Sequence, residues 1–254
     1  MSLTRLALHC AAPVPHPERF TRYLFVGPHP DDIEIGAGAT VSRLTAQGKR
    51  VTFLICTDGR YGTENTALSG EELVAARRQE ALASAALLGV TDVRFLDLSD
   101  GGAYAQQELL NGIARTIGDV QPEVLFAPDP CVRSECHTDH LNVGQAVRRL
   151  ACAAPTPGVM ATLGAQTAPV QALAYYMTAR PNRFVATRGH LKRQLDAIFT
   201  CHQSQFPPDC PAAASIRLYL RLRAADFGLR SLKGCAEGFR VLGPTHMHCL
   251  PEAE

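Results

Sequence analysis

Residues 23–34 read Tyr-Leu-Phe-Val-Gly-Pro-His-Pro-Asp-Asp-Ile-Glu and indicate the kind of fold. Its first four residues are apolar and rich in β-forming side chains, which predicts a buried strand. The prolines on either side of His29 end that strand in a turn, and a helical pattern follows over residues 36–47. The stretch therefore predicts a strand, a turn and a helix, with an imidazole and three carboxylates at the carboxyl end of the strand.

The same alternation continues along the chain. Short apolar runs bounded by Gly, Pro or charged residues predict further strands at 51–56, 93–98, 124–127 and 173–177. Helical patterns lie between and after them, at 69–88, 108–117, 139–152 and 190–202. Such alternation predicts an α/β fold, a Rossmann-like three-layer sandwich with a mostly parallel sheet. In this architecture the active site lies at the C-terminal ends of the strands.

Three local patterns refine this prediction. Ser69 and Glu72 form a Ser-x-x-Glu pattern, which predicts a capping box at the start of a helix. Residues 153–169 are rich in Ala, Pro and Thr, which predicts a long loop. Residues 206–214 contain three prolines, which predicts a segment without regular secondary structure. Either segment could be a lid or a surface loop.

Composition excludes several classes of protein. The 254 residues are 46% hydrophobic and 19% charged, as in a globular domain, and 25 Lys and Arg against 24 Asp and Glu give a net charge of +1. This balanced charge gives no overall positive potential that would attract nucleic acid. No apolar stretch is continuous enough to predict a membrane-spanning helix. The odd number of cysteines, nine, without a Cys-x-x-Cys pair, together with the lack of a secretory signal, predicts reduced thiols in the cytoplasm.

The crowding of His29, Asp31, Asp32 and Glu34 in six positions predicts a metal site. Adjacent carboxylates repel one another unless a cation neutralises them, and an imidazole nitrogen with a carboxylate oxygen can ligate a divalent cation. The alternative is that the acidic residues only cap the following helix, whose N-terminus favours anions. Capping alone does not require the histidine or two adjacent Asp, so we favour the metal.

A second cluster follows the strand predicted at 124–127. His137, Asp139 and His140 open the next helix, and two histidines three positions apart share one face of a helical turn. A lone His-x-x-His is a weak signal. Two His and Asp clusters at the carboxyl ends of two predicted parallel strands, however, could converge on one ion.

These residues resemble the signatures of the PIG-L/LmbE-like zinc N-deacetylases. His29-Pro30-Asp31-Asp32 with Glu34 is similar to the first motif of that family, and His137-Thr138-Asp139-His140 to the second. The resemblance spans about residues 24 to 248. Residues 58–63, 127–130 and 236–240 are most similar to the branch of diacetylchitobiose and N-acetylglucosamine deacetylases, whereas 207–231 resembles that branch poorly.

The resemblance implies a role for individual residues. His29, Asp32 and His140 would be the ligands of one Zn²⁺ per chain, and Asp31 the general base. His137 would stabilise the charged intermediate, oriented by Asp139.

Further residues are implied in substrate binding or at the edge of the site. Arg77 and Asp100 would bind sugar hydroxyls, and His248 would reach the site, with His246 as the alternative. Arg60 follows the strand at 51–56 and could contact substrate or simply belong to a turn at Gly59.

The resemblance implies one deacetylase domain over residues 1–254, with residues 1–20 as an extension and 203–254 shaping the cleft. The expected enzyme is a zinc-dependent amidohydrolase that removes the N-acetyl group from N-acetylglucosamine or diacetylchitobiose. Alternatives are a deacetylase of a larger N-acetylglucosamine conjugate, such as a thiol-precursor glycoside or an antibiotic pseudoaglycone, and a non-catalytic metal-dependent sugar-binding protein. A homo-oligomer, a trimer or hexamer, is also implied. A nucleotide-binding module is disfavoured, because no Gly-x-Gly-x-x-Gly is present and the acidic cluster would repel phosphate.

Overall fold

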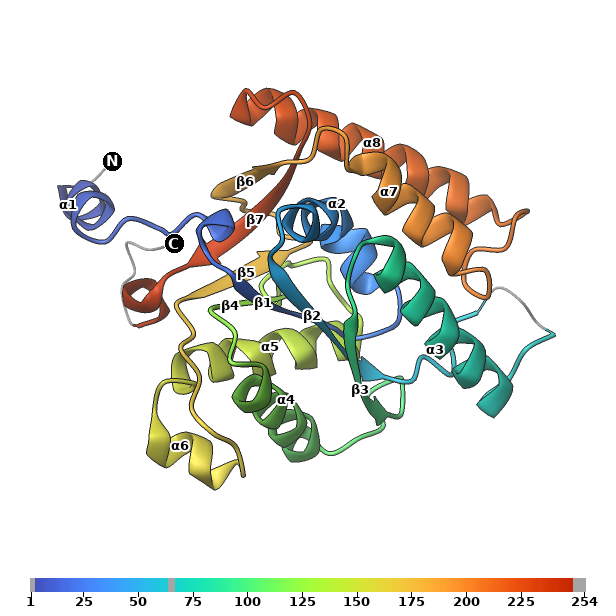
Figure 1. The fold of residues 1–254 in the computed structure, drawn as a ribbon, viewed down its shortest axis with the longest axis horizontal. Coiled ribbons are helices and arrows are strands. Elements are labelled where there is room, and N and C mark those ends of the chain that lie inside the picture. Colours follow the sequence, from blue (N-terminus) through green and yellow to red (C-terminus); the bar gives the residue numbers. More distant parts are fainter. Residues whose placement is uncertain (1–2, 64–66, 249–254) are drawn as a thin grey trace.

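A seven-stranded sheet in the order β3-β2-β1-β4-β5-β7-β6 forms the centre of the computed structural model, which describes residues 3–63 and 67–248 (Figure 1). The strands β1 to β5 pair in parallel, and β7 runs antiparallel to both of its neighbours. The mostly parallel α/β fold is thereby confirmed. The strands are β1 (Arg22–Gly27), β2 (Arg50–Thr57), β3 (Asp92–Leu98), β4 (Val124–Pro128), β5 (Ala172–Tyr176), β6 (Arg183–Ala186) and β7 (Ala236–Leu242).

Helices cover both faces of the sheet (Figure 1). One face is covered by α4 (Gln106–Val120), α5 (Thr138–Ala153) and α6 (Pro157–Thr162), and the other by α2 (Asp32–Ala46), α3 (Gly70–Leu87), α7 (Leu191–Asp196) and α8 (Pro211–Ser231). A π-helical turn η2 (Ala197–Cys201) continues α7, and 3₁₀ turns lie at Pro17–Arg19 (η1) and Pro244–Met247 (η3). The N-terminal helix α1 (Leu3–Ala11) lies at the left of Figure 1, apart from the layers. Among the described residues, no helix combines the length and apolarity that a membrane crossing requires.

Strand β1 is apolar on both faces because both faces are covered. Leu24 and Val26 belong to the core beneath α4 and α5, whereas Tyr23 and Phe25 belong to the core beneath α2. All four side chains are fully buried. A continuous apolar run is therefore what a central parallel strand requires.

The five strands predicted from sequence are present, with ends that differ by at most one residue. Two strands were not predicted, β6 and β7. The helix expected at 36–47 begins earlier, at Asp32, and the predicted loop 153–169 contains α6. The segment expected to be irregular over 206–214 becomes helical at Pro211, where the 21-residue helix α8 begins. Ser69 is the N-cap of α3, but its side chain makes no capping hydrogen bond, so the predicted capping box is wrong.

Candidate active site

The candidate site lies where the strand order reverses, at the carboxyl ends of β1 and β4. From β1 the chain continues to β2 on one side of the sheet, whereas β4 pairs on the other side. The loops that follow two such strands diverge, and ligands bind in the crevice between them. Here the crevice holds the turn before α2 and the loop before α5.

The turn after β1 has a constrained backbone. Asp31, the N-cap of α2, has φ 117°, a left-handed conformation that non-glycine residues rarely adopt. Neighbouring groups hold the turn in place: the hydroxyl of Thr57 donates to the carbonyl of Pro28 at 2.9 Å, and Arg77 donates to that of Pro30 at 2.7 Å. Such strained residues concentrate at functional sites.

His29, Asp32 and His140 form the centre of the site. One carboxylate oxygen of Asp32 lies 2.9 Å from Nδ1 of His29, and the other lies 3.3 Å from Nε2 of His140. Burial alone would favour the neutral carboxyl, but His140 and His29 outweigh it and hold the pKa of Asp32 well below its ordinary value. The three residues expected as metal ligands from the resemblance are therefore in mutual contact.

His29 is surrounded by carboxylates. Its Nε2 lies 3.1 Å from Asp100 and 3.2 Å from Asp139, on the side of the ring opposite to Asp32. Burial favours the neutral ring, but hydrogen bonds to Asp100, Asp139 and Asp32 raise the pKa of His29 to about 12. Buried acidic groups that hold a positive charge this strongly form an environment suited to a cation.

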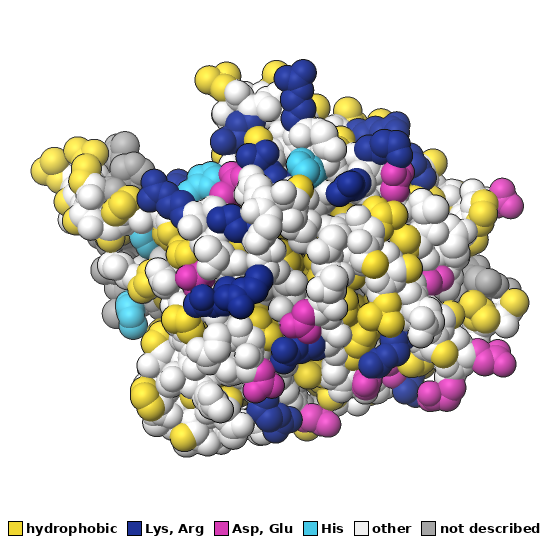
Figure 2. Space-filling view, in the orientation of Figure 1, with side chains coloured by type: hydrophobic (Ala, Val, Ile, Leu, Met, Phe, Trp, Pro, Cys, Tyr) yellow, Lys and Arg dark blue, Asp and Glu magenta, His cyan; other side chains and the backbone are white. Residues whose placement is uncertain are grey.

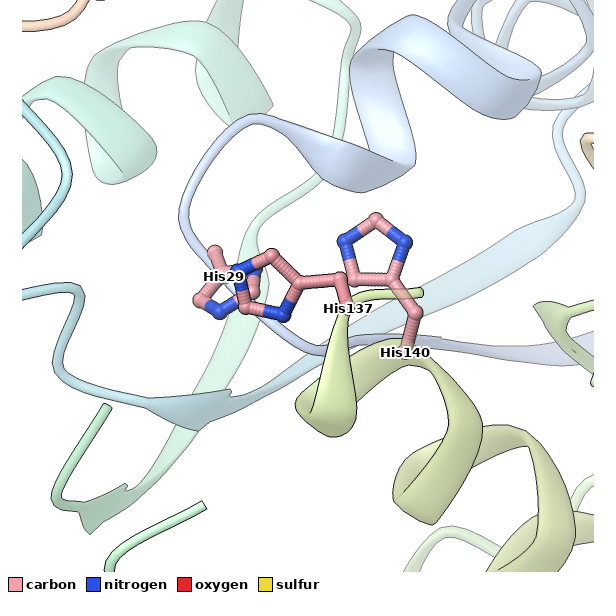
Figure 3. Close-up of side chains that lie close together, drawn as sticks. All are labelled: His29, His137 and His140. Atoms are coloured by element: carbon pink, nitrogen blue, oxygen red, sulfur yellow. The ribbon is translucent and has the colours of Figure 1, made fainter. Parts of the chain in front are cut away.

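The histidine rings converge from the turn after β1 and the start of α5. Figure 3 shows His29 beside His137, with His140 one helical turn further along α5. One ring nitrogen from each of the three lies within 4.8 Å of the others. Ring nitrogens and carboxylate oxygens at this spacing fit a divalent metal such as zinc. His137 belongs to this group too, although the resemblance assigns it another role.

His137 is the most exposed of the three histidines. Its side chain is 48% exposed, and its ring packs edge-on against His29 and stacked against His140. Asp139, expected to orient His137, lies 3.8 Å from its Nδ1. The buried carboxylate of Asp139 instead accepts hydrogen bonds from the backbone N–H groups of Gly101 and Gly102 at 2.9 Å. Asp139 therefore holds the loop after β3 against the site as well.

Asp31 is a buried carboxylate that forms an ion pair with Arg77. Its closest charged partner is Arg77, at 3.5 Å. Burial raises the pKa of Asp31, and the negative charge of the adjacent Asp32 raises it further, whereas the positive charge of Arg77 lowers it. The resulting pKa is about 6. A carboxylate with such a pKa accepts and returns a proton near neutral pH, as a general base must.

A cavity of about 300 Å³ opens above these groups. It brings together most of the residues selected from sequence, because the loops after β1, β2, β3 and β4 all contribute to its wall. Four lining residues were not singled out as site residues but lie in the segment 203–254 that was expected to shape the cleft: Gln205, Phe206, and Ala212 and Ile216 of α8. The lining residues are His29, Asp31, Asp32, Ile35, Gly62, Arg77, Asp100, His137, His140, Gln205, Phe206, Ala212 and Ile216.

Arg77 lines the cavity, but its guanidinium is already occupied. The side chain is 3% exposed and donates to the carbonyls of Gly59, Gly62 and Pro30. It therefore connects the turn after β1 with the loop after β2. Arg60 does not line the cavity; it forms an ion pair with Asp58.

His248 does not reach the site of its own chain, contrary to the expectation. Strand β7 is antiparallel to β5, and Leu242 pairs with Leu173 near the start of β5. The turn η3 and His248 follow Leu242, so they lie at the amino edge of the parallel strands, away from the cavity. The same holds for His246, which is buried against Gly243.

Two acidic residues behind the site have roles that the sequence did not indicate. Glu34 is buried, accepts a short hydrogen bond from Ser84 and lies 3.3 Å from Nε2 of His202. Glu135, in the loop before α5, lies 3.0 Å from Nδ1 of His140. No spacing rule predicts either contact, because both connect residues brought together only by the fold or by loop geometry.

Comparisons with known proteins point to the same chemistry. The PIG-L family, described as GlcNAc-PI de-N-acetylase, matches residues 24–151. A diacetylchitobiose deacetylase of Thermococcus kodakarensis is 34% identical over 235 residues, which cover 91% of this chain and 87% of that protein. A 1D-myo-inositol 2-acetamido-2-deoxy-alpha-D-glucopyranoside deacetylase of Kineococcus radiotolerans is 38% identical over 116 residues, 43% of this chain and 32% of that protein. The structure of N,N′-diacetylchitobiose deacetylase from Pyrococcus horikoshii with its inhibitor matches with a TM-score of 0.87 at 29% identity, covering 99% of this chain and 97% of that one.

Proposed function

The chain belongs to the PIG-L family of de-N-acetylases, and we propose that it hydrolyses the acetamido group of a small N-acetylglucosamine-type sugar to a free amine and acetate. The observation that carries this proposal is the pairing of Asp31 with the His29, Asp32 and His140 cluster at the floor of one cavity. A proton acceptor with a pKa of about 6 beside a cation-binding group is what amide hydrolysis requires.

We propose Zn²⁺ as the cofactor, one per chain, with His29, Asp32 and His140 as its ligands. The contacts of Asp32 with both histidines support this assignment, as does the approach of a ring nitrogen of His29 to one of His140 within 4.8 Å. When bound, zinc supplies Lewis-acid polarisation of the amide and a water whose pKa falls to about 7.

The remaining chemistry belongs to the side chains of the chain itself. Asp31 takes the proton of the attacking water and returns it to the nitrogen of the leaving amine. His137 faces the cavity from the start of α5 and donates a hydrogen bond to the oxyanion as it forms. Arg77 forms an ion pair with Asp31 and donates a hydrogen bond to the turn that carries it, so it positions Asp31 rather than binding substrate.

We propose that Asp100 binds a sugar hydroxyl. It lines the cavity and is held by His29 and by the backbone N–H of Tyr61 at 3.3 Å. The cavity volume lies at the lower end of the range for small-molecule sites, roughly 300 to 1,000 Å³. A cavity of this size is compatible with an N-acetylglucosamine-type sugar.

We further propose that the enzyme is a cytoplasmic homo-oligomer. The cysteines of the described residues are free thiols, as in a reducing compartment, whereas Cys249 lies outside the described residues. Helix α8 exposes Leu218, Leu222 and Leu229, at 58%, 61% and 75%, and Figure 2 shows Lys and Arg gathered over α7 and α8 at the top of the molecule. Exposed apolar side chains at helical spacing support burial against another copy.

Release of free amine from N-acetylglucosamine and from diacetylchitobiose, by protein loaded with zinc, tests the function. Turnover that is lost on chelation and restored by zinc supports it. Full turnover in the presence of chelator would contradict the metal-dependent chemistry.

A further inference from the structure

Glu135 holds both histidines of the second motif with one carboxylate. It lies in the loop between β4 and α5, and its side chain is 24% exposed. One oxygen accepts the backbone N–H of His137 at 2.8 Å, and the other lies 3.0 Å from Nδ1 of His140. Both contacts come from a residue outside the cavity wall.

The contact with His140 fixes the protonation pattern of its ring. An ionised carboxylate can only accept hydrogen bonds, so Nδ1 of His140 must carry the hydrogen that it donates to Glu135. In the neutral ring the other nitrogen, Nε2, then carries the lone pair. That nitrogen faces the metal site, 3.3 Å from Asp32.

A purely structural role of Glu135 would require only one of its two hydrogen bonds. The hydrogen bond to the N–H of His137 suffices to close the loop onto the start of α5, where His137 is the N-cap. The second oxygen adds nothing to the helix start, because its partner is a side chain one turn further along. It acts on the orientation and tautomer of the His140 ring.

We propose that Glu135 is a positioning residue that presents Nε2 of His140 to the metal. This inference rests on the proposed metal-dependent function and names a residue that the motif comparison did not select. Carboxylates that accept a hydrogen bond from the remote nitrogen of a metal-ligating histidine raise the basicity of that ligand and fix its ring. Their loss typically weakens metal binding about 10- to 100-fold.

The test measures zinc affinity rather than turnover. Metal-free wild type, Glu135→Ala and Glu135→Gln compete for zinc with a chromophoric chelator of known affinity. We expect about 10- to 100-fold weaker binding in Glu135→Ala and a smaller loss in Glu135→Gln, whose amide oxygen still accepts from Nδ1 without the charge. Glu108→Ala, an exposed glutamate in the first turn of α4, is the matched control and should bind zinc as wild type does.

Thermal unfolding of the metal-free proteins separates positioning from folding. A partly exposed ion pair contributes little to stability, so the melting temperature of Glu135→Gln should stay within about 4 °C of wild type. If Glu135→Ala does not fold, the zinc affinity of Glu135→Gln alone tests the proposal. Zinc binding within twofold of wild type in the folded variants would overturn the proposal.

The outcome is separable from that of the proposed function. Lack of turnover on either sugar would leave a Glu135-dependent zinc affinity intact, and the positioning role with it. Turnover with zinc but an affinity insensitive to Glu135 would reject the positioning role and keep the deacetylase. Absence of zinc binding in the wild type would reject both the metal site and the role of Glu135.

Discussion

The guanidinium of Arg77 lies 3.5 Å from the carboxylate of Asp31, and both side chains are buried beneath the cavity. The arginine is held by three backbone carbonyls, so its position is fixed before any substrate arrives. It stabilises the ionised form of Asp31 against the effect of burial. The proton acceptor and the turn that carries it thus depend on the same residue.

The first prediction concerns the pH profile of the reaction. Asp31 must be ionised to accept a proton, so kcat/KM should rise with pH through about 6 and level off above it. Arg77→Met removes the charge that lowers this pKa, so the rising limb should move to higher pH; Arg77→Lys should move it less. Profiles of kcat/KM for both variants and for Arg78→Met, whose side chain is 42% exposed, measure the shift. An unchanged limb in Arg77→Met would show that another group limits the rate.

His137→Ala separates a hydrogen-bond donor from a metal ligand. If His137 donates only to the developing oxyanion, kcat should fall about 100- to 1,000-fold while zinc affinity changes by no more than a few-fold. Its 48% exposure favours this role over that of a ligand. Chelator competition measured beside kcat decides between them, because a large loss of zinc affinity would make His137 a ligand.

Much of the fold follows from the sequence because β1, β2, β4 and β5 are almost entirely buried and largely apolar. The runs at 23–26 and 124–127 are covered on both faces, so their composition alone identifies them as central strands. Strand β7 could not be found in this way, because its Glu237 and Arg240 interrupt the apolar pattern. Helix α8 was missed because leucines occur on its exposed face as well as its buried one, which removes the helical periodicity.

The residues of the candidate site likewise fall into those that the sequence could identify and those that it could not. The two His and Asp clusters could be found because each follows a recognisable strand, and parallel strands bring their carboxyl ends together. The choice of His29, Asp32 and His140 among them came from the family resemblance. His248 was misplaced because position in the sequence does not tell which edge of the sheet an antiparallel strand approaches. The contact of Glu135 depends on the path of a loop, which residue types do not specify.

Gly36→Ala should destabilise the protein through the contact between α2 and β5. A Cβ at Gly36 would overlap the ring of Tyr176, whose hydroxyl donates to the carbonyl of Val26 at 2.8 Å. Tyr176 is fully buried and cannot move aside freely, so overpacking should cost about 1–3 kcal/mol. Urea denaturation measures it, with Gly158→Ala as the control because a Cβ there meets open space. Equal midpoints for the two variants would show that the helix shifts without cost.

Glu237 should make stability fall as the pH rises. Burial raises the pKa of Glu237 to about 7, although the backbone N–H groups of Thr40 and Ala39 oppose the shift. The unfolded chain releases this proton near 4.5, so between 4.5 and about 7 the folded state binds more protons. Stability from this group is complete below 4.5 and is lost on the way to 7, by at most about 3 kcal/mol.

The variant Glu237→Gln isolates this contribution from those of other titrating groups. It keeps a neutral side chain at every pH, so the difference in unfolding free energy between wild type and variant should change between pH 5 and pH 8. Over that interval the unfolding free energy of the wild type should fall by more than that of the variant. A difference that is constant with pH would mean that Glu237 titrates near its ordinary pKa.

Asp31→Asn, assayed beside wild type for amine release and for bound zinc, tests the central claim most directly. We expect one zinc per chain in both proteins, turnover of N-acetylglucosamine or diacetylchitobiose by the wild type, and loss of that turnover in the variant and in chelator-treated wild type. A variant that binds zinc and keeps the wild-type rate would contradict the role of Asp31 as general base.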